Sequence, residues 1–422
     1  MPMAEAKNRE KRDGDRLIWV LLATAGLLLV FAVIAQPDST LFTGFWRIQT
    51  SQAGLITDPM AVGGVGSALL NAGLVLLVST ALVRLLRVPF TGMSFACLYM
   101  MAGFALLGKN LLNISPILLG GWLYSRYRKE SFSKYIYLTL FGTCLSPMVS
   151  FLLVNVASGW RWLAMGAMGV VIGFLLPAVA GYTVRIHQGY NLYNVGFAAG
   201  FLGLGIASIL KGFGVTFTTE STWSGEGHGL LCVLVALLLL GLLVLGAALG
   251  CRRWRDYRLI LRHSGRSVAD FILLDGPART FVNMALVGAI GFAYLLCVGV
   301  RLNGPLVCCL FSMVGFAAFG KHPRNVTPLM AGAVLAAVGL EKLPVTAPGV
   351  LLATLFCTGL APIAGQFGWY WGVTAGFLHM AIVQNTGVLH GGMNLYNNGF
   401  AAGLVCVLLI PVIEALKPEP KE

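Results

Sequence analysis

Two copies of one fourteen-residue stretch constrain this chain more than any other feature. The first copy, HQGYNLYNVGFAAG, runs from His187 to Gly200, and the second, HGGMNLYNNGFAAG, runs from His390 to Gly403. Eleven of the fourteen positions are identical, and three further matches follow in the same order in both parts of the chain. Shared apolar composition can produce one chance match but not an ordered series, so the chain contains an internal duplication. The further matches are GFALLGKNLLNISP with GFAAFGKHPRNVTP, TLFGTCLSP with TLFCTGLAP, and GFL with GFL.

The apolar content shows what kind of protein is duplicated. Of the 422 residues, 57% are hydrophobic and only 11% are charged, about half the charged fraction of a soluble domain. Apolar runs such as 17–35 and 229–250 are close to the roughly 20 residues that span a bilayer. The sequence therefore predicts an all-α, polytopic membrane protein, with 17–35 as an uncleaved first helix.

Seven apolar segments are expected in each half. Segments 92–108 and 114–125 are short for full crossings and are separated by polar residues, which predicts a re-entrant hairpin or broken helices. The segments are 17–35, 62–83, 92–108, 114–125, 134–156, 162–184 and 190–213 in the first half, and 229–250, 279–300, 304–320, 326–340, 347–366, 369–389 and 391–413 in the second. The expected parts are a cytoplasmic tail (1–16), two membrane repeats (17–214 and 229–414), an external linker (215–228) and a cytoplasmic tail (415–422).

Opposite charge in equivalent loops predicts that the second half is inserted upside down. The loop at 126–134 carries four basic residues, whereas its counterpart carries only Lys342. Conversely, 36–61 holds Arg47 alone, and its counterpart at 252–266 holds six arginines. Because basic loops stay on the cytoplasmic side, this pattern predicts two inverted-topology repeats with both termini in the cytoplasm.

Several classes of function are not expected. The net charge of +13 is spread over short loops, so we predict no nucleic-acid partner. The nine cysteines lie within or beside apolar runs without metal-ligand spacing, so neither a disulfide framework nor a metal site is expected. Sequence signatures of soluble enzymes, such as GxSxG, HExxH or a phosphate loop, are missing, so we assign no catalytic residue and no cofactor.

The duplicated stretch supplies the first set of candidate site residues. Asn191 and Asn194 are three residues apart and would share one face of a helix, with Tyr193 beside them. Their amides offer donors and acceptors to a small polar solute. The alternative is structural, with the amides capping the helix or bonding neighbouring helices. Substrate binding is predicted for Asn191, Tyr193, Asn194, Asn394, Tyr396 and Asn397.

Two lysines form the second set. Lys109 and Lys321 lie at the breaks between short segments, and a charge inside a membrane is functional by default. They are suited to attract an anionic group, beside helices expected to begin near Ser115-Pro116 and Thr327-Pro328. The alternative is that both lysines extend to the membrane surface. The predicted substrate-binding set here is Lys109, Lys321, Asn113 and Asn325.

Acids and histidines at matched positions are candidates for ion or proton coupling. Asp58-Pro59 and Asp275-Gly-Pro277 each precede the second segment of a half, where an N-cap is the alternative role. His187 and His390 precede the asparagine motifs and titrate near neutrality, although a hydrogen-bonded structural histidine is the alternative. The coupling candidates are Asp58, Asp275, His187 and His390.

The repeated NLYN-x-GFAAG element and the run GGVGSALLNAG resemble an uncharacterised family of bacterial multi-pass membrane proteins, a domain of unknown function. This resemblance implies the bacterial inner membrane and carries over no substrate. Two inverted halves are also similar in architecture to urea transporters and aquaporins, whose motifs are missing here. We predict a secondary transporter of a small polar solute, and the two lysines weakly favour an anionic one. The alternatives are a channel for a small neutral solute and a lipid-modifying membrane enzyme. The expected partners are the bilayer and the solute, and a homo-oligomer is compatible with the sequence.

Overall fold

The computed structural model is helical, with no β-strand element in the described residues, which are 2–157, 159–217, 221–340 and 343–416. For residues 2–16 only the backbone is described. Lys342 and most of the predicted C-terminal tail lie outside the described residues. The predicted all-α class is confirmed.

The first half contains a series of helices that begins with the longest one and ends with the first copy of the duplicated stretch. They are α1 (Pro2–Ala35), α2 (Thr40–Thr50), α3 (Pro59–Gly63), α4 (Val65–Leu85), α5 (Gly92–Ala105), α6 (Leu111–Tyr127), α7 (Ile136–Gly142), α8 (Ser146–Asn155), α9 (Arg161–Ile186) and α10 (Asn194–Gly212).

The second half repeats this order with small changes. Its helices are α11 (His228–Ala248), α12 (Trp254–Tyr257), α13 (Phe271–Asp275), α14 (Pro277–Cys297), α15 (Gly304–Phe316), α16 (Pro323–Gly339), α17 (Pro348–Phe356), α18 (Ala361–Phe367), α19 (Trp369–Thr386) and α20 (Asn397–Ala415).

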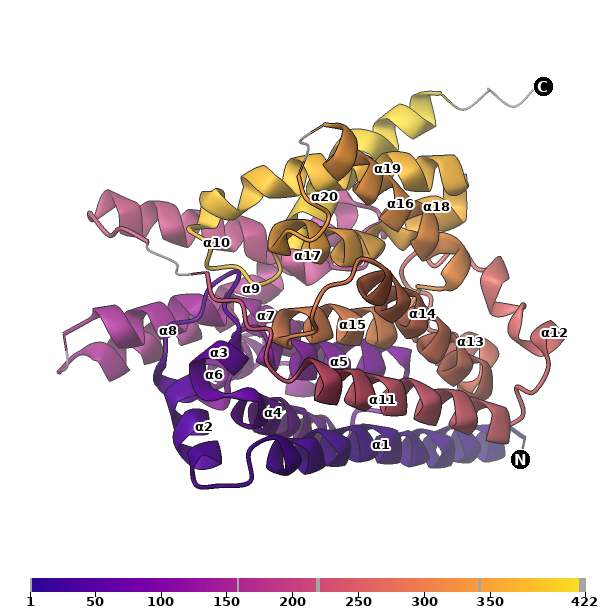
Figure 1. Ribbon diagram of the computed structural model, residues 1–422, viewed down its shortest axis with the longest axis horizontal. Coiled ribbons are helices and arrows are strands. Elements are labelled where there is room, and N and C mark those ends of the chain that lie inside the picture. Colours follow the sequence, from indigo (N-terminus) through magenta and orange to yellow (C-terminus); the bar gives the residue numbers. More distant parts are fainter. Residues whose placement is uncertain (1, 158, 218–220, 341–342, 417–422) are drawn as a thin grey trace.

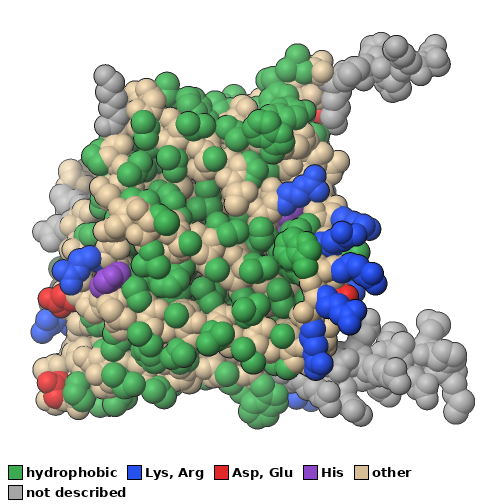
Figure 2. All heavy atoms as spheres, turned by 45° about the vertical axis from the view of Figure 1, so that its right-hand side comes forward, with side chains coloured by type: hydrophobic (Ala, Val, Ile, Leu, Met, Phe, Trp, Pro, Cys, Tyr) green, Lys and Arg blue, Asp and Glu red, His purple; other side chains and the backbone are tan. Residues whose placement is uncertain are grey.

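Nine helical stretches in the described part of the chain are long and apolar enough to cross a membrane. Two of them, Ile136–Asn155 and Pro348–Phe367, are interrupted by short 3-10 turns at Thr143–Leu145 and Cys357–Leu360. Figure 2 shows charged side chains near two opposite ends of the molecule, with hydrophobic and uncharged side chains between them. A polytopic membrane protein has this distribution.

Helices α5 and α15 form the centre of the molecule, between the α1–α4–α11 group and the helices of the duplicated stretches (Figure 1). With 14 and 13 residues they are shorter than a membrane span, and almost all of their residues are buried. Glycines allow them to lie close together: a Cβ on Gly315 would lie 2.7 Å from the Tyr99 Cβ. The short segments predicted to form a re-entrant hairpin or broken helices therefore lie in the core.

The helices that follow these breaks begin earlier than predicted. We expected starts near Ser115-Pro116 and Thr327-Pro328, but α6 begins at Leu111 and α16 at Pro323, so both prolines lie inside helices. The reason is a capping box in each half. Asn113 Oδ1 accepts a hydrogen bond from the backbone N–H of the N-cap residue Asn110 over 2.9 Å. This cap fixes the start of α6 at Leu111. Asn325 does the same for His322 over 2.8 Å.

The region 36–61, expected to be a loop, contains α2 and α3. Leu41, Gly44 and Ile48 of α2 are buried at helical spacing, whereas Phe42 and Trp46 are exposed. A short amphipathic helix of this kind lies along a surface and does not cross the membrane.

Helices α1 and α11, the first long helix of each half, run in opposite directions. In Figure 1, α1 begins at the end of the molecule that holds α12, whereas α11 finishes at that end. The end of α20 also lies there. Basic side chains gather at this end in Figure 2.

Candidate functional site

Two lysine–tyrosine pairs join the halves at the centre of the molecule. The Lys109 ammonium Nζ donates a hydrogen bond to the Tyr396 hydroxyl over 2.8 Å. Lys321 Nζ donates to the Tyr193 hydroxyl over 2.6 Å. Each pair takes its lysine from one half and its tyrosine from the other, so the structure brings together two predicted sets that are far apart in the sequence.

Both lysines are fully buried, with 0% of each residue exposed. This burial excludes the alternative in which they extend to the membrane surface. Lys109 Nζ lies 4.6 Å from the ring centroid of Tyr396, and Lys321 Nζ lies 4.8 Å from that of Tyr193. In the described chain, no carboxylate lies within ion-pair distance of either ammonium group. Aromatic rings and hydroxyls are their main polar surroundings.

Two asparagines hold the broken backbone on which the lysines stand. Asn71 Nδ2 donates to the carbonyls of Ala105 and Lys109 over 2.9 and 2.8 Å. Asn283 makes the two equivalent bonds around Lys321, each over 2.7 Å. One side-chain amide thus satisfies carbonyls that the end of a helix leaves without partners. Neither residue is in the site predicted from the sequence, although an asparagine at matched places in two apolar segments could have indicated both.

The tyrosines are held by the first asparagine of each duplicated stretch. The backbone N–H of Tyr193 donates to Asn191 Oδ1 over 2.8 Å, and that of Tyr396 donates to Asn394 Oδ1 over 2.9 Å. Asn191 Nδ2 also donates to the carbonyl of Gly399 in the other half over 3.0 Å. Asn394 Nδ2 is buried and has no hydrogen-bond partner among the described residues.

The loops that carry the tyrosines are also tied to the interrupted helices of the opposite half. The Leu192 N–H donates to the carbonyl of Gly359 over 2.9 Å, and the Leu395 N–H donates to that of Cys144 over 3.0 Å. Both carbonyls belong to the 3-10 turns that break these helices. A turn that releases a carbonyl from helical bonding supplies the acceptor.

The second asparagine of each stretch bonds the histidine that precedes it. Asn194 Oδ1 lies 2.8 Å from His187 Nε2, and its Nδ2 donates to the carbonyl of Ala180 over 3.1 Å. Asn397 Oδ1 lies 3.0 Å from His390 Nε2. Contacts of this kind are expected under the structural alternative. They do not test substrate binding by the asparagines or coupling by the histidines. Both remain predictions.

The acids lie away from the lysine–tyrosine pairs. Asp58 caps α3, and its carboxylate accepts the N–H groups of Met60 and Ser224, each over 3.0 Å. Burial is the main influence on its acidity and raises the pKa of Asp58 to about 6, against opposing hydrogen bonds from backbone N–H groups. Asp275 instead lies at the end of α13, with its Oδ2 2.7 Å from His263 Nε2. Coupling by either acid remains a prediction.

The counterpart of Asp58 is Asp270, which corrects the pairing of Asp58 with Asp275. Asp270 caps α13 as Asp58 caps α3, and each cap is followed by a glycine with positive φ, Gly276 or Gly64. Gly64 and Gly276 are separated by the same number of residues as the repeat counterparts Lys109 and Lys321, which supports the pairing of Asp58 with Asp270. The pairing of Asp58 with Asp275 from the sequence was wrong because a proline follows closely after both residues.

Two cavities of very different size meet at the tyrosines. One, of about 310 Å³, is lined by Tyr193 and Tyr396 and reaches Lys134 and Ser267 at the end of the molecule that holds α12. The other, of about 10 Å³, is lined by the same two tyrosines and by the repeat counterparts of the first cavity's walls. The counterparts, first cavity then second, are Leu192 and Leu395, Gly196 and Gly399, and Phe316 and Phe104.

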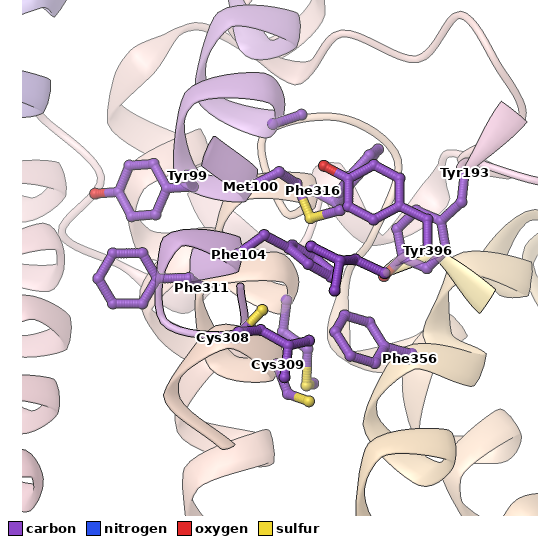
Figure 3. Packing of buried hydrophobic residues seen from close by; sticks show 14 of the residues in the cluster. Tyr99, Met100, Phe104, Tyr193, Cys308, Cys309, Phe311, Phe316, Phe356 and Tyr396 are labelled. Carbon is purple, nitrogen blue, oxygen red and sulfur yellow. The ribbon is translucent and has the colours of Figure 1, made fainter. Parts of the chain in front are cut away.

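Figure 3 shows Tyr193 and Tyr396 side by side, with Phe104, Phe316 and Phe356 around them. The Phe104 and Tyr396 ring centroids are 4.4 Å apart, and those of Tyr193 and Phe316 are 5.0 Å apart. Similar aromatic contacts in both halves therefore surround the pair.

Comparison with known proteins gives a family but no function. No curated protein and no solved structure matched the chain. The profile of a family described as "Protein of unknown function (DUF1576)" matches residues 37–212 and 251–415, one stretch in each half. These two stretches cover most of the chain, so this duplicated helical membrane protein belongs to the DUF1576 family.

Proposed function

We propose that the protein is a secondary transporter of a small polar, anionic solute in the bacterial inner membrane, and that it works by alternating access. The observation that carries this proposal is the inequality of the twin cavities, about 310 Å³ against about 10 Å³. A space of 10 Å³ holds about one water molecule. Of the two cavities that Tyr193 and Tyr396 line, only the larger one has room for a solute in this conformation.

Pseudo-symmetry supplies the second conformation. The walls of the two cavities are repeat counterparts, so exchanging the conformations of the two halves would open the small cavity and close the large one. Transporters with inverted repeats use such an exchange around a site at the repeat interface. The two states then differ little in contacts, which keeps both within reach at ordinary temperature.

The opposite placement of equivalent loops supports inverted topology. Ser267 and Val268 line the large cavity at the end that holds α12. Their repeat counterparts, Leu55 and Ile56, line a separate cavity of about 470 Å³ with Lys211. The basic end is cytoplasmic in this proposal, which places both termini in the cytoplasm and makes the described conformation open to the inside.

The two buried lysines support an anionic solute. An ammonium group that stays charged in an apolar interior is costly without a partner of opposite charge, and the described surroundings of Lys109 and Lys321 provide none. An anion between them would supply that partner. The proposed site lies at the interface of the halves, where each lysine bonds a tyrosine of the other half.

Counterflow in proteoliposomes tests the proposal. A thermal-shift screen of metabolites on the purified protein first identifies a solute, since a ligand of the native state raises its stability. Vesicles preloaded with unlabelled solute should then accumulate labelled solute transiently and saturably. Equilibration without counterflow would instead establish the channel, and lipid turnover by the purified protein would establish the membrane enzyme.

A further inference from the structure

The large cavity is apolar along most of its depth. Met100, Phe141, Phe316 and Phe319 line it between the mouth and the tyrosines. A volume of about 310 Å³ lies at the lower end of the range for small-molecule sites. These walls favour a compact ligand with an apolar body over a sugar or a polyhydroxylated solute, because apolar side chains leave hydroxyl groups without hydrogen-bond partners.

Tyr193 and Tyr396 line the inner end of the cavity, and each is hydrogen-bonded through its hydroxyl to a buried lysine that does not itself line the cavity. Lys109 donates to the Tyr396 oxygen, so the hydroxyl proton of Tyr396 is left to donate elsewhere, and the described residues provide no acceptor for it. The Tyr193 hydroxyl shares its second hydrogen bond with Ser312 over 2.9 Å. Tyr396 is therefore the better placed of the two donors for an incoming acceptor.

The groups around the ammonium ions do not carry compensating charge. The thiols of Cys97, Cys144 and Cys308 are near enough to influence Lys109 electrostatically. Those of Cys309 and Cys357 influence Lys321 in the same way. Every one of these thiols is fully buried, and a thiol in apolar surroundings stays neutral. The inner end of the cavity therefore lacks negative charge until a ligand brings it.

The mouth of the cavity does not offer a second anion site. Lys134 lines it, but Lys134 Nζ lies 2.8 Å from the Glu130 carboxylate, so its charge is already paired. A ligand with negative charge at both ends would leave one end near Met100 or Phe141, without a cation. One negative charge, at the inner end only, fits the distribution.

We propose that the transported solute is a small organic monocarboxylate with an apolar body. Its carboxylate accepts the hydroxyl proton of Tyr396 and is balanced by Lys109 and Lys321, while its apolar body lies against Met100 and Phe316. This inference rests on the proposed function only in taking the cavity as the transport site.

A matched ligand series tests the class on full-length protein in nanodiscs. The probes are 3-phenylpropanoate, its neutral amide 3-phenylpropanamide, acetate and succinate, with binding measured by calorimetry and thermal shift. 3-Phenylpropanoate should bind at least about tenfold more tightly than each of the other three, because only it combines one charge with an apolar body. Equal binding of the amide, or tighter binding of succinate or acetate, would overturn the proposal, as would failure of 3-phenylpropanoate to bind.

Variants locate the binding. Tyr396→Phe and Lys109→Met should each weaken 3-phenylpropanoate at least about tenfold, whereas Lys211→Met, which lies in the separate cavity at the other end, should leave it unchanged. Tyr396→Phe keeps the ring and its packing, so it remains informative if the lysine variant fails to fold. Unchanged affinity in Tyr396→Phe would contradict the assigned carboxylate position. Accessibility of Leu192 and Leu395 from the two membrane sides, measured without ligand, reports on alternating access independently of this ligand class.

Discussion

Gly196 and Gly399 face each other where α10 and α20 cross, and a Cβ built on either would lie 3.0 Å from the Cα of the other. The contact joins equivalent positions of the two halves. The pseudo-twofold axis therefore passes close to it, beside the tyrosines that separate the two cavities. Small residues at this crossing let the helices approach closely enough for the halves to share one site.

Packing at this crossing should tolerate no added methyl group. In Gly403→Ala the new Cβ would lie 2.0 Å from Phe197 Cδ2, and in Gly200→Ala it would lie 2.1 Å from Phe400 Cδ2. Each variant should lose about 1–3 kcal/mol of stability through overpacking, measured as a lower melting temperature in detergent. Gly205→Ala, in α10 with Gly200, is the control. It meets nothing within 4 Å and should be neutral or more stable. Equal effects of all three changes would contradict this account of the crossing.

Asp270 should stabilise the contact between halves by capping two helices at once. Its carboxylate accepts the N–H groups of Gly92 and Met93 at the start of α5 over 2.9 and 3.1 Å, and those of Ile272 and Leu273 in its own helix over 3.1 and 3.2 Å. Asp270→Asn keeps the shape but turns one acceptor into a donor, so a loss of about 1–3 kcal/mol is expected.

Thermal unfolding compared with Asp256→Asn measures this effect. Asp256 lies in the first turn of the short helix α12, outside the shared cap. A loss in Asp270→Asn no larger than that in Asp256→Asn would show that the shared cap contributes little.

The buried Asp58 should make stability depend on pH. Its pKa is about 6 in the folded protein, raised by burial from 3.8, so the folded state holds the proton more tightly than the unfolded state. The resulting stabilisation is present below pH 3.8 and is lost as pH rises to about 6. For a shift of this size the loss amounts to roughly 3 kcal/mol. The difference in melting temperature between wild type and Asp58→Asn should therefore change between pH 4 and pH 6 and stay constant above pH 7. A difference independent of pH would contradict it.

Topology should separate two equivalent loops. In a background without the exposed Cys297, Ser131→Cys in the 126–134 loop should react with a membrane-impermeant maleimide from the cytoplasmic side only. Thr346→Cys, beside the counterpart loop, should react from the outside only. Labelling of both positions from one side would exclude inverted repeats.

Much of this fold was predictable because a duplication exposes its own architecture. Matched motifs locate the breaks at Lys109 and Lys321, and hydropathy locates most of the helices. Short surface helices such as α2 escaped because eleven residues of amphipathic sequence look like a loop between strongly apolar segments. The early starts of α6 and α16 depend on side-chain caps, which hydropathy does not register.

The site was predictable as a set of residues but not as an arrangement. Repeated placement pointed to the lysines and tyrosines, yet no local pattern indicates that Lys109 meets Tyr396 and not Tyr193. That pairing depends on how the halves cross, which is decided by long-range packing. The inequality of the two cavities is likewise invisible in a sequence whose halves are nearly equivalent at these positions.

Accessibility of one matched pair of leucines tests alternating access most directly. Leu192 lines the large cavity and Leu395, its repeat counterpart, lines the small one. Single cysteines at these two positions should be probed with impermeant maleimide from each side of oriented vesicles, with and without a transported solute. Leu192→Cys should react from the cytoplasmic side, Leu395→Cys should be protected at rest, and solute should change both rates in opposite directions, with new Leu395→Cys labelling from the outside. Reaction of both cysteines at once from opposite sides, or rates that never change in opposite directions, would contradict alternating access.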